Sequence, residues 1–214
     1  LFIPQHRKSR SLYAGLPVEI IKLKYNPVWI PFIIIPVISA GIGTVNFLAN
    51  QGVLSFTRDS LWTQQSLFLG IFFLSPLIGI LAGMLWRMEH QWGNFNIMLT
   101  VTSGVKLIKD KWLTASLLSI MCMVWISIIF IVSGNILGIS ENVPIEFYYR
   151  ILAGSLCIIA VAGIQCMLSL IFSSFALPVV IAFFGNISGL VLTVKGFYYA
   201  TPFSCLIYSM GSTA

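Results

Sequence analysis

Charged residues are what this sequence has least of. Asp, Glu, Lys and Arg make up 8% of its 214 residues, with 12 basic and 6 acidic side chains, whereas a soluble domain carries about 25%. A membrane-spanning helix needs about 20 mostly apolar residues. This scarcity excludes a soluble globular enzyme, a nucleic-acid-binding protein and a disordered tail. It predicts an all-α polytopic membrane protein, whose uncharged stretches are residues 25–57, 60–86, 112–140, 151–194 and 196–214.

The side chains that carry out catalysis are also scarce. Neither an HExxH nor a GxSxG motif occurs, and no Gly-Lys-Ser/Thr marks a nucleotide-binding loop. The two histidines, His6 and His90, lie outside the apolar runs. We therefore expect no metal site, no cofactor and no ATP hydrolysis in this chain alone. The lack of a nucleophile–base pair in the spans disfavours an intramembrane enzyme. The cysteines form no CxxC pattern and are interpreted as small buried thiols: Cys122, Cys157, Cys166 and Cys205.

The apolar runs predict one membrane domain over residues 1–214. A short helix at 16–26, with Pro17 in its first turn, is expected to lie on the membrane surface. The run 151–194 is too long for one helix, and Ser173-Ser174 followed by Pro178 predicts a break there. We expect residues 196–214 to be an external tail. The five visible spans are expected at about 28–48, 64–86, 112–134, 149–172 and 176–195.

The positions of the charges predict the orientation. Nine of the 12 basic residues lie in the N-terminal segment or in residues 87–111, and two spans separate these regions. The connection 135–147 carries two acids, Glu141 and Glu146, and no basic residue. Because basic residues concentrate on the cytoplasmic side, the N-terminus and residues 87–111 are predicted to be cytoplasmic.

Polar side chains within the spans are few. No acidic or basic residue lies near the middle of a span, which argues against an ion-coupled carrier. Asn46, Gln165 and Asn186 are the polar exceptions. They either form hydrogen bonds between helices or line a translocation path.

Three pairs of glycines are spaced four residues apart. Such spacing lets helices approach closely, either within one bundle or at a dimer face. The pairs are Gly79/Gly83, Gly134/Gly138 and Gly185/Gly189.

Residues 87–111 form the one substantial polar stretch between spans. Phe95, Met98 and Leu99 have the spacing of one apolar helical face. A break at 100–104 follows, and then a second helical pattern whose lysines lie near lipid headgroups. We interpret the stretch as an amphipathic cytoplasmic hairpin with an apolar face that binds a partner. The alternative is a helix that lies on the membrane.

This stretch also carries a resemblance to a known family. Glu89-His90, Asn94-Phe95 and Met98-Leu99, followed by Lys106 and Lys111, resemble the cytoplasmic loop of ABC-type exporter permeases of the type-2 membrane-domain family. The Glu-His and Asn-Phe pairs are most similar to lantibiotic-immunity permease subunits. Two features depart from the family: the break Thr102-Ser103-Gly104 contains no proline, and family members have six spans whereas five are visible here. The resemblance therefore implies a sixth span in the complete protein.

The resemblance implies a multi-pass permease in a bacterial cell membrane. Two permeases, identical or paralogous, would pair, and each would contact a cytoplasmic subunit that binds ATP and Mg²⁺. Glu89 would anchor the coupling hairpin, Trp92, Phe95 and Leu99 would dock on the ATPase, and Lys111 would close the hairpin. The complex would expel a lantibiotic or similar antimicrobial peptide from the membrane.

Two alternatives remain open at the level of sequence. The chain could be a non-transport membrane module, such as an assembly factor or a receptor subunit. It could also belong to an ABC exporter of another substrate, such as a lipid or a drug.

Overall fold

The computed structural model describes residues 15–24, 27–90, 99 and 103–211, and these residues contain helices and no strand. The predicted all-α class is therefore confirmed. Five helical segments are long and apolar enough to cross a membrane. The helices are α1 (Gly15–Lys24), α2 (Trp29–Ala49), α3 (Arg58–Phe68), the π-helical η1 (Leu69–Phe73), α4 (Leu74–His90), α6 (Gly104–Ile136), α7 (Ile145–Ile171), α8 (Ala176–Val194) and α9 (Pro202–Ser209).

Several helices extend beyond the predicted spans. The second span, predicted at 64–86, is a continuous α3–η1–α4 helix over 58–90, and α6 begins at Gly104 rather than at 112. Charged side chains end a membrane-spanning run, but they do not end a helix, because Lys, Arg and Glu are good helix formers. The break predicted at Ser173-Ser174 is present between α7 and α8.

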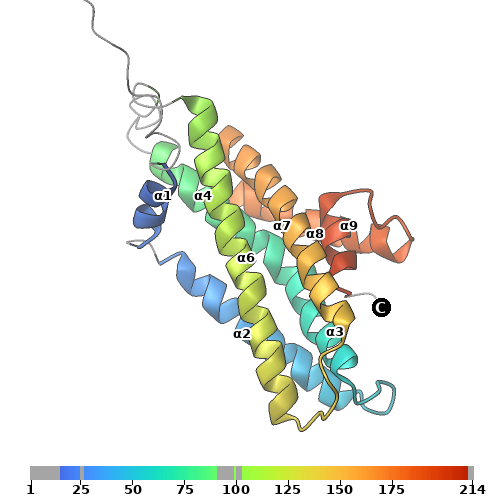
Figure 1. Cartoon of the computed structure of the whole chain (residues 1–214). Helices are drawn as coiled ribbons and strands as arrows, with labels where there is room; N and C mark the ends of the chain where they lie inside the picture. Colours follow the sequence, from blue (N-terminus) through green and yellow to red (C-terminus); the bar gives the residue numbers. More distant parts are fainter. Residues whose placement is uncertain (1–14, 25–26, 91–98, 100–102, 212–214) are drawn as a thin grey trace, which may run out of the picture.

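The helices pack mainly as neighbours in pairs. Close contacts join α2 to α3, α6 to α7 and α4 to α8, while α9 lies against both α7 and α8. Figure 1 shows α6 and α7 side by side along the bundle, with α1 beside the first turns of α6. Trp62 fills the core near the opposite end, where its ring lies 5.3 Å from that of Phe130 and 4.9 Å from that of Phe147.

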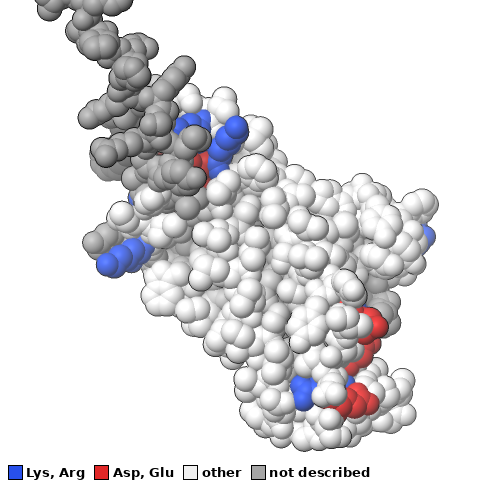
Figure 2. Space-filling view, viewed as in Figure 1, with Lys and Arg blue, Asp and Glu red and all other residues white. Residues whose placement is uncertain are grey.

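Charged side chains gather at the two ends of the bundle. In Figure 2 a broad uncharged band separates the end that carries α1 from the end that carries most of the acidic surface. The exposed Glu141 and Glu146 lie at the latter end, where α6 gives way to α7. The end that carries α1 and the start of α6 is the one that the sequence predicts to be cytoplasmic.

The predicted external tail is instead a helix packed on the bundle. Thr201 caps α9 with a reciprocal capping box to Ser204, and Pro202 occupies the first turn, where its missing N–H costs nothing. The Trp62 indole N–H donates to the carbonyl of Met210 over 2.9 Å. The 19 residues 196–214, with one proline and three serines, are typical of a loose tail, but their buried apolar positions favour packing: Phe203, Leu206, Ile207 and Met210.

The contact between α7 and α9 makes a direct prediction about two cysteines. The Sγ atoms of Cys157 and Cys205 lie 3.0 Å apart, and both side chains are partly exposed, whereas Cys122 and Cys166 are buried. Mild oxidation with copper phenanthroline and oxygen is expected to join Cys157 to Cys205 within one chain. Peptide mapping under non-reducing conditions measures the link. Cys205→Ser should abolish it, and a link to Cys122 or Cys166 instead would contradict the packing of α9.

Candidate functional site

Four charged side chains meet at the end of the bundle that carries α1. Glu19 and Lys22 come from α1, Glu89 from the last turn of α4 and Lys111 from α6. The Lys22 Nζ lies 2.9 Å from Glu19 Oε1 and 2.7 Å from Glu89 Oε1. We call these four residues the charge cluster. Its two carboxylates and two ammonium groups balance, so the cluster buries no net charge.

Lys111 is the centre of the charge cluster. Its Nζ donates to Leu85 O over 2.7 Å and to Glu19 Oε2 and Glu89 Oε1 over 3.1 Å each. An ammonium group has three donors, and all three are used. The side chain is completely buried and its Nζ lies 5.3 Å from the centre of the Trp86 ring, close enough for a cation–π attraction. A buried lysine with every donor satisfied holds three helices together.

Local sequence explains how each helix contributes. Glu19 and Lys22 are three residues apart on α1, which places them on one side of that helix. Glu89 lies one turn beyond Leu85 on α4, so its carboxylate and the Leu85 carbonyl can reach the same cation. Lys111 lies two turns into α6, where the long side chain reaches across to the ends of the other two helices.

The charges of the cluster stabilise one another. Burial alone would lower the pKa of Lys22, but hydrogen bonds to Glu89 and Glu19 and the charges of both outweigh it and raise that pKa. Burial alone would raise the pKa of Glu89, but the hydrogen bond from Lys22 and the charge of Lys111 outweigh it and lower that pKa. Both groups therefore stay ionised throughout the neutral range.

These opposite shifts predict how stability depends on pH. The lowered pKa of Glu89 adds stability that is present above the ordinary glutamate pKa and is lost as pH falls through the lowered value. The raised pKa of Lys22 adds stability that is present below the ordinary lysine pKa and is lost as pH rises through the raised value. The midpoint of thermal unfolding of the purified protein should stay nearly constant over a broad pH range between these limits. In Glu89→Gln the fall of the midpoint at acid pH that comes from Glu89 should disappear. An unchanged fall at acid pH would contradict the ion pairing.

Two of the predicted coupling residues, Glu89 and Lys111, are thus brought together. Leu99 is exposed, whereas Trp92 and Phe95 lie outside the described residues. Within the predicted hairpin 87–111, α4 continues to His90 and α6 begins at Gly104, and residues 91–98 and 100–102 lie outside the described residues. The charge cluster therefore ties down both ends of the connection that lies between these two helices.

Sequence reasoning did not place Glu19 and Lys22 in this site. Glu19 is the only acidic residue before Asp59, and a lone acid among basic residues at a membrane surface is a signal of a specific partner. The partner itself is 92 residues away along the chain, so no local pattern identifies it.

Asn186 supports the irregular turn in the middle of the second span. Its amide Nδ2 donates to the carbonyls of Gly70 and Ile71 over 3.0 Å each, and its Oδ1 accepts a hydrogen bond from Ser75 over 2.6 Å. A π-helical turn widens the backbone and shifts its hydrogen bonds out of α register. Asn186 provides donors for two carbonyls of this turn, and it joins α8 to the second span.

The other two polar span residues lie at different interfaces. Asn46 donates to Gln64 between α2 and α3. Gln165 is completely buried on α7, and its amide has no hydrogen-bond partner among the described residues. A Cβ atom added to Gly79 would lie 3.2 Å from Gln165 Oε1, so this amide faces α4. The structure does not bring Asn46, Gln165 and Asn186 into one continuous surface.

The glycine pairs allow close approaches of different kinds. Gly79 and Gly83 face the start of α8, at Pro178–Val179 and Phe175, and Gly185 and Gly189 face Phe203 and Ser204 of α9. Gly134 faces the guanidinium of Arg58. Gly138 differs from the predicted packing role, because nothing lies within 4 Å of the position of its Cβ and its φ is +71°. This left-handed conformation ends α6.

At the opposite end of the bundle, the adjacent residues Arg58 and Asp59 bind different partners. Asp59 pairs with Arg150 of α7 over 2.7 Å rather than with the adjacent Arg58. The Arg58 Nη2 donates to Asn135 Oδ1 over 2.7 Å and to the Ile139 carbonyl over 3.1 Å. These bonds fasten the start of the second span to the end of α6.

The fold and the charge cluster define a polytopic membrane protein in which buried ion pairs join α1, α4 and α6. Residues 16–189 match the ABC-2 family transporter protein. This match covers most of the chain, and the chain belongs to that family: it is the membrane permease component of an ABC-2 type transporter. Such a permease implies an ATP-binding partner subunit and typically has no ATPase activity itself. The comparisons with curated proteins and with solved structures found no match.

Proposed function

We propose that this permease works in an ATP-driven exporter and that the charge cluster couples the ATP-binding subunit to the spans. The observation that carries the proposal is the completely buried Lys111, which binds Glu19 and Glu89 at once. The ATP-binding subunit binds ATP and Mg²⁺, and a second permease completes the complex.

The coupling follows from which elements the cluster joins. The ATP-binding subunit would contact the connection between α4 and α6, and its movement would displace this connection. Glu89 holds the end of α4 and Lys111 holds the start of α6, while Glu19 and Lys22 bring α1 into the same network. Removing one partner of a buried ion pair costs about 3–5 kcal/mol, so this junction moves as one unit. Movement of the connection is therefore transmitted to the second and third spans together.

For the substrate we propose a lantibiotic or a similar antimicrobial peptide taken from the membrane. The support is the resemblance of Glu89-His90 and Asn94-Phe95 to permeases of lantibiotic immunity. A membrane-embedded cargo also agrees with the scarcity of charged residues in the spans, and Asn46, Gln165 and Asn186 each lie between helices. Another amphipathic molecule, such as a lipid or a drug, is the alternative cargo.

Reconstitution with the ATP-binding subunit tests the proposal. Glu89→Gln keeps the shape of the side chain but removes its charge, so it should leave the permease in the membrane while permease-dependent ATP hydrolysis falls by about tenfold or more, since each 1.4 kcal/mol is tenfold. Cells that depend on the complex should lose tolerance of the peptide.

Glu146→Gln is the matched control, because Glu146 is exposed at the outer end of the bundle. It should leave both activities unchanged. If Glu89→Gln retains full ATP hydrolysis and peptide tolerance, the cluster does not couple the subunits. If no nucleotide-binding protein copurifies with the wild-type chain, a non-transport role is correct instead.

A further inference from the structure

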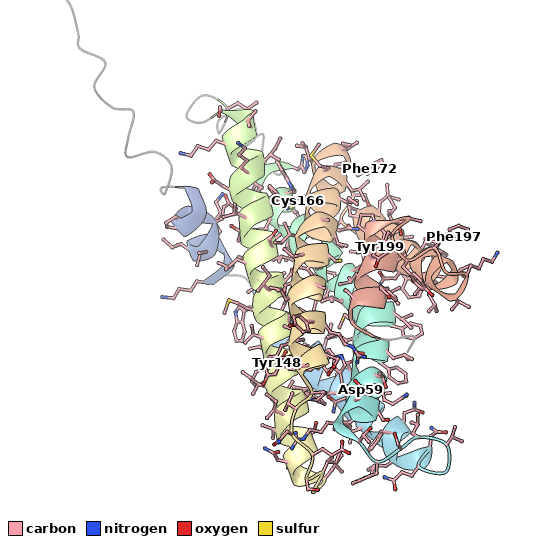
Figure 3. All side chains as sticks on the ribbon, turned by 45° about the vertical axis from the view of Figure 1, so that its right-hand side comes forward. Asp59, Tyr148, Cys166, Phe172, Phe197 and Tyr199 are labelled. Carbon is pink, nitrogen blue, oxygen red and sulfur yellow. The ribbon has the colours of Figure 1, made fainter. Side chains whose placement is uncertain are left out.

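The connection between α8 and α9, residues 195–201, lies at the depth of the middle of the bundle. Tyr199, Ala200 and Thr201 line one pocket together with Leu156 and Cys157 of α7. Because α7 has 27 residues, it is about 40 Å long, and Cys157 lies close to its midpoint. In Figure 3 Phe197 and Tyr199 lie to one side, at a height between Tyr148 and Phe172, which mark the two ends of α7. We call residues 195–201 the lateral elbow.

The contacts of α8 explain this depth. Asn186 binds the Gly70 and Ile71 carbonyls near the middle of the second span. Two turns later Thr193 donates to the Ser204 carbonyl over 3.3 Å, and the neighbouring Cys205 contacts Cys157. The end of α8 therefore lies beside α9, and α9 lies against the middle of α7.

The lateral elbow has the wrong chemistry for contact with lipid. Lys195 is exposed, and Figure 2 shows basic surface at the edge of the uncharged band over the segment that follows α8. The backbone is irregular, since Gly196 has a φ of +84°. Irregular backbone at membrane depth occurs only where it is buried in protein or lines water, and a charge there is costly.

Its surface favours protein over water. Phe197 is 62% exposed and Tyr199 is 76% exposed. Tyr198 stacks on Tyr208 with ring centres 4.2 Å apart, which holds the aromatic surface rigid. Rigid Tyr and Phe side chains are enriched at protein interfaces, whereas a water-filled cavity would leave this apolar area wet.

We propose that a second copy of this chain covers the lateral elbow, so that two elbows meet across a two-fold axis. A surface that pairs with itself must be self-complementary. The elbow meets this condition because it offers both a cation, on Lys195, and exposed aromatic faces, on Phe197 and Tyr199, and ammonium groups bind such faces. The proposal names the surface through which two permeases pair. It rests on the proposed function only in assuming that two permeases form one complex.

Photo-crosslinking in native membranes tests the proposal. The full-length permease is expressed together with its ATP-binding subunit and carries p-benzoylphenylalanine in place of Tyr199. Irradiation is expected to give an adduct of twice the mass of the chain, and mass spectrometry of its peptides should show two copies of this sequence. The same substitution at Met121, which is exposed in the middle of α6, is the matched control and should give lipid adducts only.

The other outcomes overturn the proposal. A lipid adduct at Tyr199 would show that the elbow faces the bilayer, and labelling by a charged, water-soluble reagent without an adduct would show a water-filled cavity. An adduct to a different protein, or within the same chain, would identify another occupant. The same substitution at Phe197 repeats the test if the Tyr199 variant does not accumulate. Formation of the adduct does not depend on ATP hydrolysis. The crosslinking result can therefore be interpreted even if the proposed coupling is wrong.

Discussion

Lys111→Glu is expected to abolish permease-dependent ATP hydrolysis, whereas Lys109→Glu, two residues earlier on the same helix, should leave it nearly unchanged. The two substitutions change the charge equally. They differ because Lys111 is completely buried among Glu19, Glu89 and the Leu85 carbonyl, whereas Lys109 is exposed.

The size of the effect follows from the burial of the carboxylates. Lys111→Glu brings three carboxylates together against Lys22 alone, and Glu19 and Glu89 each have side chains only 3% exposed. Loss of one partner of a buried pair costs about 3–5 kcal/mol, and like charges add to that cost. ATP hydrolysis by the reconstituted complex, compared with that of the isolated ATP-binding subunit, measures the loss.

A milder variant separates coupling from folding. Lys111→Met keeps much of the length of the side chain and should also lose coupling, with the permease still inserted in the membrane. Equal losses for Lys109→Glu and Lys111→Glu would mean that surface charge, and not the buried cluster, matters to the partner.

Gly43→Val is expected to have the largest effect on folding. A Cβ at this position would lie 2.5 Å from Gln65 Cα and 2.6 Å from the Gln64 carbonyl oxygen, and both are backbone atoms that cannot move aside. The branched side chain would therefore force α2 away from α3. Overpacking costs about 1–3 kcal/mol and occasionally more, and contact with backbone belongs at the upper end.

Gly41→Val is the matched control for this prediction. It lies on the same helix, but nothing approaches within 4 Å of the position of its Cβ. Thermal unfolding followed by size-exclusion chromatography in detergent should show a lower midpoint for Gly43→Val and an unchanged midpoint for Gly41→Val. Similar midpoints for both would contradict the close contact between α2 and α3.

The membrane topology could be predicted from sequence because it depends on local composition. Apolar runs specify where helices cross the bilayer, and Ser173-Ser174 with Pro178 specifies the break between α7 and α8. The count of five long apolar helices and the presence of a short helix at Gly15–Lys24 therefore agree with the structure.

The charge cluster shows what local composition leaves out. Glu89 and Lys111 were predicted to act in one cytoplasmic loop, but their bonds to Glu19 and Lys22 join residues 67 to 92 positions apart. Such pairs depend on how the helices pack, and one sequence contains no direct signal for that packing.

The α8–α9 region was predicted least well for a related reason. Residues 196–214 contain one proline, two glycines and three serines, which is typical of a loop. Their position depends on Gly185 and Gly189, which let Phe203 and Ser204 approach α8 closely. The spacing of these glycines predicted a close approach, but not that a short helix would be the partner.

A double-mutant cycle on Glu89 and Lys111 tests the central claim most directly. Permease-dependent ATP hydrolysis would be measured for Glu89→Gln, Lys111→Met and the double variant, all in the same reconstituted complex. If the two side chains act as one buried unit, each single change already breaks the junction, and the double variant should lose little more than either one. Losses that simply add would show that Glu89 and Lys111 act independently, and the charge cluster would then not be the coupling element.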